Sequence, residues 1–77
     1  MNIKVLGPGC ARCHQTEKIV RETVAEEKAD AVVEYVTDLK EIARYGIFST
    51  PGVVVDGVVK STGKVPKKEE IKGWLRK

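Results

Sequence analysis

The stretch Gly7-Pro8-Gly9-Cys10-Ala11-Arg12-Cys13-His14 decides the interpretation of this chain, because it contains both of its cysteines. It follows the apolar run Ile3 to Leu6 and leads directly into a long helical pattern. Residues i and i+3 at the start of a helix lie on one side, with Cα atoms about 5 to 6 Å apart, which a disulfide spans. The stretch therefore predicts a reversible dithiol at a strand-to-helix junction.

Length and composition indicate a small folded protein. The 77 residues, with 42% hydrophobic and 32% charged side chains, predict one α/β domain spanning residues 1–77. The net charge of +3 is modest, and Lys and Arg are largely interleaved with Glu, so we expect no nucleic-acid partner. No run approaches the roughly 18 apolar residues of a membrane span, and the first residues do not resemble a signal peptide. We therefore expect a cytoplasmic protein that does not associate with membranes.

The first half of the chain predicts a β-α-β unit. Residues 1–6 form a first strand, residues 11–28 carry an amphipathic helical pattern, and residues 31–37 alternate as a second strand. The helix is expected to bury Cys13, Thr16, Ile19, Val20 and Val24. A helix between two strands predicts that they run parallel with a right-handed crossover, and the first strand is the natural centre of the sheet.

The second half predicts a short helix, a hairpin and a terminal helix. Asp38 is a candidate N-cap for a helix that buries Leu39, Ile42 and Ala43 and ends at Gly46, after which Ile47 and Phe48 return to the core. Asp-Gly between the β-branched runs of residues 53–60 predicts an antiparallel hairpin with a type I′ turn. Residues 61–65 are expected to be a loop, and Pro66 to open a helix that buries Ile71, Trp74 and Leu75.

Four chemical interpretations of the two cysteines compete. A purely structural disulfide would close a very short loop and add little stability in a reducing compartment. The sequence Cys-x-x-Cys-His also fits covalent haem attachment, but His14 is the only histidine and Met1 the only methionine, so a second axial ligand is lacking. Zinc needs four ligands, whereas soft Cu(I) accepts two thiolates, so a metal-carrying role stays open. Reversible redox chemistry is the interpretation that the residues support best, and it requires no cofactor or resident metal.

The position of each cysteine suggests its role in thiol–disulfide exchange. Cys10 lies at the expected start of the helix, where the helix dipole and unpaired N–H groups favour a thiolate, and Arg12 adds positive charge. We therefore expect Cys10 to be the attacking nucleophile. Cys13, one turn further in, would be the shielded resolving thiol.

The whole chain resembles the thioredoxin and glutaredoxin superfamily. The shared features are Cys-x-x-Cys after a first strand, Thr50-Pro51 before a hairpin, and a late glycine ahead of the last helix. Within it, the Gly7-Pro8-Gly9-Cys10 run resembles the small redox-active disulfide proteins of prokaryotes. The resemblance implies a thioredoxin fold, β-α-β-α-β-β-α, with a central four-stranded mixed sheet flanked by three helices.

The resemblance also implies site residues, partners and an activity. Pro51 would be a cis-proline opposite the disulfide, and the backbone of Thr50 would pair with an extended substrate; Gly9 and Arg12, next to the cysteines, complete the expected substrate-binding set. The implied function is thiol–disulfide oxidoreductase. It would be a monomer acting on disulfide-bearing proteins, with a thiol reductant or reductase as its second partner. The alternative is a binding module or Cu(I)/Zn carrier of the same fold that uses the two thiols without redox turnover.

Overall fold

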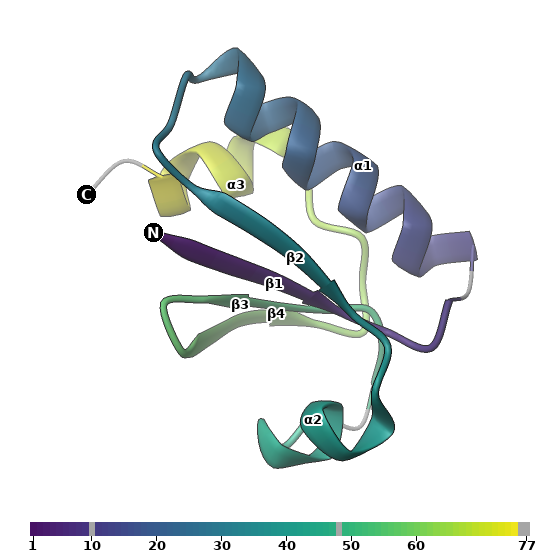
Figure 1. Ribbon diagram of the computed structural model, residues 1–77. Helices are drawn as coiled ribbons and strands as arrows, with labels where there is room; N and C mark the ends of the chain where they lie inside the picture. Colours follow the sequence, from purple (N-terminus) through teal and green to yellow (C-terminus); the bar gives the residue numbers. More distant parts are fainter. Residues whose placement is uncertain (10, 48, 76–77) are drawn as a thin grey trace.

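A computed structural model describes residues 1–9, 11–47 and 49–75, so Cys10, Phe48, Arg76 and Lys77 lie outside the described residues. The element order is β-α-β-α-β-β-α, as predicted, and the elements form one layered structure (Figure 1). Their bounds are β1 Asn2–Leu6, α1 Ala11–Glu26, β2 Val32–Val36, α2 Leu39–Arg44, β3 Gly52–Val55, β4 Val58–Thr62 and α3 Lys68–Leu75.

The four strands form one mixed sheet in the order β2-β1-β3-β4, which confirms the predicted thioredoxin fold. β1 runs parallel to β2 and antiparallel to β3, and β3 and β4 form the predicted antiparallel hairpin. Asp56 and Gly57 at the hairpin turn have φ of 50° and 82°, the two positive values that a type I′ turn requires. β1 therefore lies in the interior of the sheet, as its apolar sequence predicted.

Helices cover both faces of the sheet (Figure 1). α1 and α3 pack together on one face, over a core formed by Ile3, Val5, Val20, Val53, Val55 and Ile71. α2 lies on the opposite face, over a smaller core formed by Leu6, Ile42, Ile47 and Val54. Alternate residues of β1 and β3 thus enter different cores, as the two-residue period of a strand requires.

α1 buries Cys13, Thr16, Val20 and Thr23, while the expected Ile19 and Val24 are only half-buried. The hydroxyls of Thr16 and Thr23 each donate a 2.8 Å hydrogen bond to the carbonyl four residues earlier, so neither polar group is buried unpaired. The helix ends at Glu26, two residues before the predicted Lys28. Lys28 has φ 50° and donates to the Ala25 carbonyl, while Ala29 donates to Val24. This is a Schellman ending formed without glycine, so the usual sequence signal for the end was missing.

Three other predictions of local structure were wrong in detail: the end of β4, the buried face of α2 and the start of α3. Ser61 and Thr62, expected in a loop, belong to β4, because a bulge at Lys60 lets the ladder continue to Ser61 opposite Val53 and Thr62 opposite Gly52. In α2 Leu39 is 68% exposed and Ala43 is exposed, because the helix packs on the sheet through Ile42, its only buried residue, which contacts Leu6 and Val54.

The last helix begins at Lys68 rather than directly after Pro66. The Lys67 carbonyl accepts from the N–H groups of Glu70 and Ile71, and the Glu70 carboxylate accepts from the Lys67 N–H across 3.3 Å. Lys67 is therefore the N-cap, with the reciprocal bond of a capping box. Ile71 is fully buried, and Trp74 and Leu75 are half-buried against the same core. None of the helices described in residues 1–9, 11–47 and 49–75 has the length and apolar character needed to cross a membrane.

Candidate functional site

The strand register places the segment before α1 beside the Thr50–Pro51 segment. Leu6, the last residue of β1, pairs with Gly52, the first residue of β3. One residue further along, the Gly7 N–H donates to the Val36 carbonyl across 2.9 Å, so the backbone stays tied to β2 beyond the end of β1. Because β1 and β3 run antiparallel, the residues after Leu6 lie opposite those before Gly52. The candidate active site is this edge of the sheet, meaning the side where β1 ends and β3 begins and not an outer strand.

Cys13 is fully buried at this edge, packed directly on Gly7. A Cβ added to Gly7 would overlap Cys13 Sγ, would lie 2.9 Å from Cys13 Cβ, and would lie 3.9 Å from Thr50 Cβ. Gly7 therefore lies close to both the Cys13 and the Thr50 side chains. The structure brings Cys13 and Thr50 together, two residues 37 positions apart in the sequence.

The Thr50–Pro51 peptide bond is cis, the geometry that the family resemblance implied. Pro51 is buried and Thr50 is half-buried. The Gly63 N–H donates to two carbonyls that flank Thr50, those of Ser49 at 3.2 Å and Pro51 at 2.9 Å. The loop after β4 thus holds the Thr50–Pro51 segment from the side away from β1.

The other predicted site residues lie at the solvent-facing side of this edge. Gly9 is exposed with φ 100°, a conformation that favours glycine, and Arg12 is exposed in the first turn of α1. That first turn contains no acidic residue. Cys10, the predicted nucleophile, lies outside the described residues, so its placement stays a prediction.

His14 is exposed on α1, and its ring contacts Tyr35 of β2 with centroids 5.4 Å apart and planes inclined by 59°. Tyr35 is half-buried and packs against the α1/α3 core. In the described part of the chain, no group of three or more His, Cys, Asp or Glu residues is arranged to hold a metal ion.

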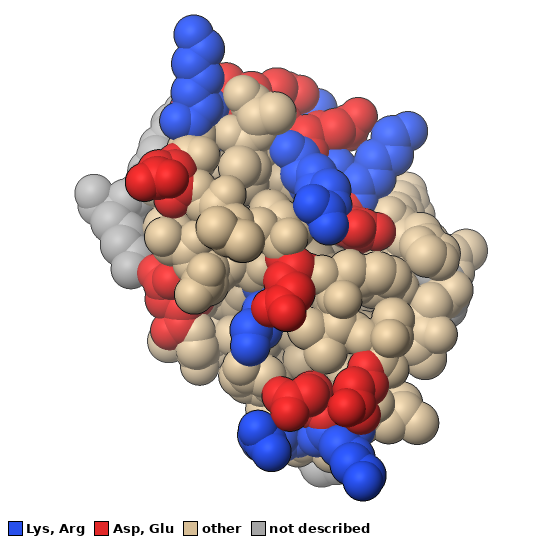
Figure 2. Space-filling view, in the orientation of Figure 1, with Lys and Arg blue, Asp and Glu red and all other residues tan. Residues whose placement is uncertain are grey.

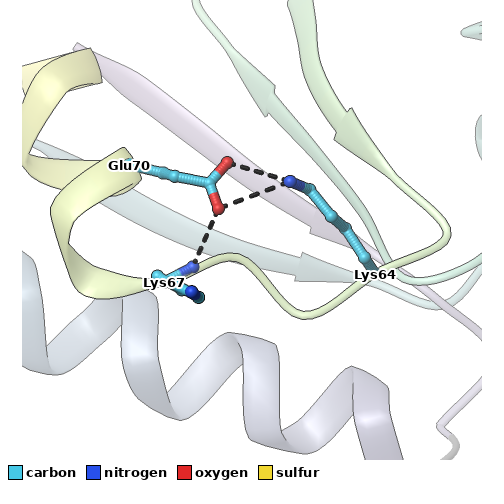
Figure 3. Close-up of polar contacts among 3 residues, drawn as sticks. All are labelled: Lys64, Lys67 and Glu70. Atoms are coloured by element: carbon cyan, nitrogen blue, oxygen red, sulfur yellow. Dashed lines mark hydrogen bonds and ion pairs between the residues drawn. The ribbon is translucent and has the colours of Figure 1, made fainter.

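A polar network holds the loop that carries Gly63. Lys64 Nζ lies 3.4 Å and 3.1 Å from the two carboxylate oxygens of Glu70, which also accepts from the Lys67 N–H (Figure 3). The Lys64 hydrogen bond, followed by that of the Lys67 backbone, lowers the pKa of Glu70. The loop is therefore attached to α3 on one side and to the Thr50–Pro51 segment on the other.

Two site residues escaped the sequence interpretation. Gly7 was noted only as part of a glycine-containing run, and Gly63 only as a late glycine. Their close contacts join residues far apart in the chain, so nothing in the local sequence distinguishes them from ordinary turn glycines. The one available signal was the position of Gly7 directly after an interior strand; the position of Gly63 directly after β4 emerges only from the structure.

Comparison with known proteins now identifies the family. The family model described as "Thioredoxin domain" matches residues 1–76. The chain belongs to the thioredoxin family. A protein named thioredoxin from Methanocaldococcus jannaschii is 45% identical over 74 residues, which cover 96% of this chain and 85% of that protein. Another, from Methanothermobacter thermautotrophicus, is 43% identical over 75 residues, 97% of each chain.

Membership of the thioredoxin family determines the general activity. The protein is a thioredoxin-like thiol–disulfide oxidoreductase, as the sequence predicted, and the alternative of a metal carrier without redox turnover is not favoured. Thioredoxin-family proteins in general act on disulfide-bearing proteins and are themselves reduced by a reductase.

Charged side chains are unevenly distributed over one face of the molecule. Acidic and basic side chains are mixed over the face shown in Figure 2, without a continuous basic stripe. On the same face, the surface over the start of α1 and the connection from β1 carries few charged side chains (Figures 1 and 2).

Proposed function

We propose that Cys10 and Cys13 are the redox couple of this oxidoreductase and that protein disulfides are its substrates. The observation that carries the proposal is the burial of Cys13 at the first turn of α1, against Gly7 and next to Thr50. A thiol in this position is shielded from solvent, and it lies three positions after Cys10 in the sequence. It is therefore suited to react with a sulfur at position 10 rather than with an incoming substrate.

The proposed reaction has two exchange steps. The Cys10 thiolate attacks one sulfur of the substrate disulfide, forming a mixed disulfide and releasing the other substrate sulfur as a thiolate, which takes up a proton. The Cys13 thiolate then attacks Cys10 Sγ, forms the Cys10–Cys13 disulfide and releases the second substrate thiolate. The substrate gains two electrons and two protons, and a reductase restores the dithiol.

The surroundings of α1 favour a thiolate at position 10. The start of a helix presents unpaired N–H groups and the positive end of the helix dipole. Arg12 adds positive charge, and the absence of acidic residues from the first turn of α1 leaves this field unopposed there. Both effects stabilise the anion over the thiol, which makes Cys10 the better nucleophile of the pair.

Thr50, Pro51, Gly9 and Arg12 are the proposed substrate-binding residues. Thr50 lies near Gly7 and Cys13 and directly precedes Pro51, and the exposed Gly9 and Arg12 flank position 10 in the sequence. An extended substrate segment laid along Thr50 would bring its disulfide to this edge. On the face shown in Figure 2 the surface over the start of α1 carries few charged side chains, which suits contact with a protein surface.

We propose further that residues 1–77 act as one cytoplasmic domain and as a monomer. The two outer strands of the sheet, β2 and β4, are the places where another sheet could pair. β4 carries a bulge at Lys60, and β2 has the exposed Glu34 at its centre. Bulges and charges on outer strands oppose edge-to-edge association.

A redox titration against glutathione, coupled to reduction of insulin, tests the proposal. The wild type should show one reversible two-electron couple and should reduce insulin. Cys13→Ser should accumulate a mixed disulfide on Cys10, whereas Cys10→Ser should trap little. Trapping mainly in Cys10→Ser would reverse the roles. Stoichiometric Cu(I) binding without any reversible couple would reject the redox function itself.

A further inference from the structure

We propose that Gly7 is a positioning residue for the resolving step: its missing side chain allows Cys13 Sγ to lie where it can attack a mixed disulfide on Cys10. This inference rests on the proposed function and deepens it. The observation is that a Cβ at position 7 would overlap Cys13 Sγ and lie 2.9 Å from Cys13 Cβ, distances that real side chains do not tolerate.

The need for glycine at this position is steric, not conformational. Gly9, Gly46, Gly57 and Gly63 have φ between 72° and 100°, whereas Gly7 lies outside the left-handed region. An alanine could therefore adopt the Gly7 backbone without strain. What excludes it is the cysteine packed on its Cα.

The backbone of Gly7 cannot move away from Cys13. Its N–H donates to the Val36 carbonyl at 2.9 Å, and its neighbour Leu6 is fully buried and paired with both Val36 and Gly52. A methyl group at position 7 must therefore displace the cysteine. Rotation about the Cys13 side chain would relieve the overlap with Sγ but not the 2.9 Å approach to Cβ, so the first turn of α1 must shift as well.

Such a shift acts on the second exchange step more than on the first. The first step depends on the Cys10 thiolate and on the substrate. The second step requires a nearly collinear arrangement of Cys13 Sγ, Cys10 Sγ and the leaving sulfur. A misplacement of about 1 Å from such a geometry lowers the rate about 100-fold. The methyl group would also lie 3.9 Å from Thr50 Cβ, in the space between the cysteine and the Thr50–Pro51 segment.

A symmetric aromatic disulfide separates the two steps, because attack by Cys10 releases one coloured thiolate and resolution by Cys13 releases the other. Stopped-flow absorbance on Gly7→Ala should show a first phase close to that of the wild type and a second phase slowed about tenfold or more. Acid quenching and mass spectrometry should show the mixed disulfide accumulating. Gly73→Ala is the matched control, since Gly73 lies in α3 with nothing within 4 Å of an added Cβ.

The outcomes distinguish this inference from the function on which it rests. A wild type that never releases the second thiolate would reject the proposed function. A normal wild type together with unchanged phases in Gly7→Ala, or with both phases slowed equally, would reject the role of Gly7 alone.

If Gly7→Ala does not fold, Gly7→Ala/Cys13→Ala is tested for recovery of the fold. The double variant should then show a cooperative unfolding transition that Gly7→Ala lacks, because removing the sulfur removes the closest overlap. A double variant that also lacks this transition would reject the contact as the reason for glycine.

Discussion

The Gly63 N–H donates to the Pro51 carbonyl across 2.9 Å, so the loop after the last strand holds the proline segment of the candidate site. Gly63 also donates to Ser49, which places its two acceptors on either side of Thr50. Since Cys13 lies on the β1 side of Thr50, the Thr50–Pro51 segment is fixed between Cys13 and this loop. The proposed substrate-binding segment is thus positioned by residues from both halves of the chain.

Gly63→Ala should destabilise the protein and weaken capture of protein substrates. Gly63 has φ 72°, where alanine costs about 1–2 kcal/mol, and an added Cβ would lie 3.0 Å from Ser49 Cβ. The shift would disturb the segment that we propose binds an extended substrate, so KM for insulin should rise while the rate with a small aromatic disulfide changes little. Denaturant unfolding and the two assays measure these effects.

Gly73→Ala is the control for that variant as well. It adds the same methyl group in the interior of α3, where replacing glycine should stabilise the helix by about 0.5–1 kcal/mol. Equal losses with insulin and with the small disulfide in Gly63→Ala would contradict a role of Gly63 in substrate binding.

Glu70→Gln should make the stability of the protein less dependent on pH in the acid range. The bonds from Lys64 and from the Lys67 N–H lower the folded-state pKa of Glu70, so its stabilising contribution is complete above the unfolded-state pKa, about 4.3. That contribution is lost as the pH falls through the lower folded-state value. The urea midpoint of the wild type should therefore fall more steeply in acid than that of Glu70→Gln.

Glu69→Gln is the matched comparison, since Glu69 is exposed on the same turn of α3 and makes neither contact. Its stability in the acid range should follow that of the wild type. If Glu69→Gln and Glu70→Gln had the same profile, the Lys64–Glu70 ion pair would not be linked to folding.

The sequence predicted the sheet, the hairpin turn and the facing of Cys13 well, because each depends on a local pattern. Apolar alternation in β1, Asp56-Gly57 at the turn and a helical period from Ala11 all operate within a few residues. The errors arose where contacts with residues distant in the sequence determine the local structure. The end of β4 depends on a bulge opposite Val53, and the exposure of Leu39 depends on how α2 lies over the sheet. For the same reason the contacts of Gly7 and Gly63 could not be predicted.

Paired substitutions in α2 test that correction. Leu39→Ala should change stability by no more than about 0.5 kcal/mol, since Leu39 is 68% exposed. Ile42→Ala should cost about 2–5 kcal/mol, because Ile42 is 4% exposed and packs with Leu6, Ile47 and Val54. Equilibrium denaturation measures both. A large decrease in the free energy of unfolding of Leu39→Ala would show that Leu39 is part of the core, as its sequence spacing predicts.

The Lys68–Glu26 ion pair should tie α3 to α1, the helix that carries Cys13. Lys68 Nζ lies 2.6 Å from Glu26, and this bond raises the pKa of Lys68 and lowers that of Glu26. Lys68→Glu and Glu26→Lys should each lower the denaturant midpoint by placing like charges together, and the double exchange should recover most of the loss. Added salt should reduce all three differences. The same exchange at Glu17 and Arg21, a pair within α1, gives the comparison for a contact that joins no second element. Independent effects at Glu26 and Lys68, without recovery in the double variant, would show that the pair does not couple the two helices.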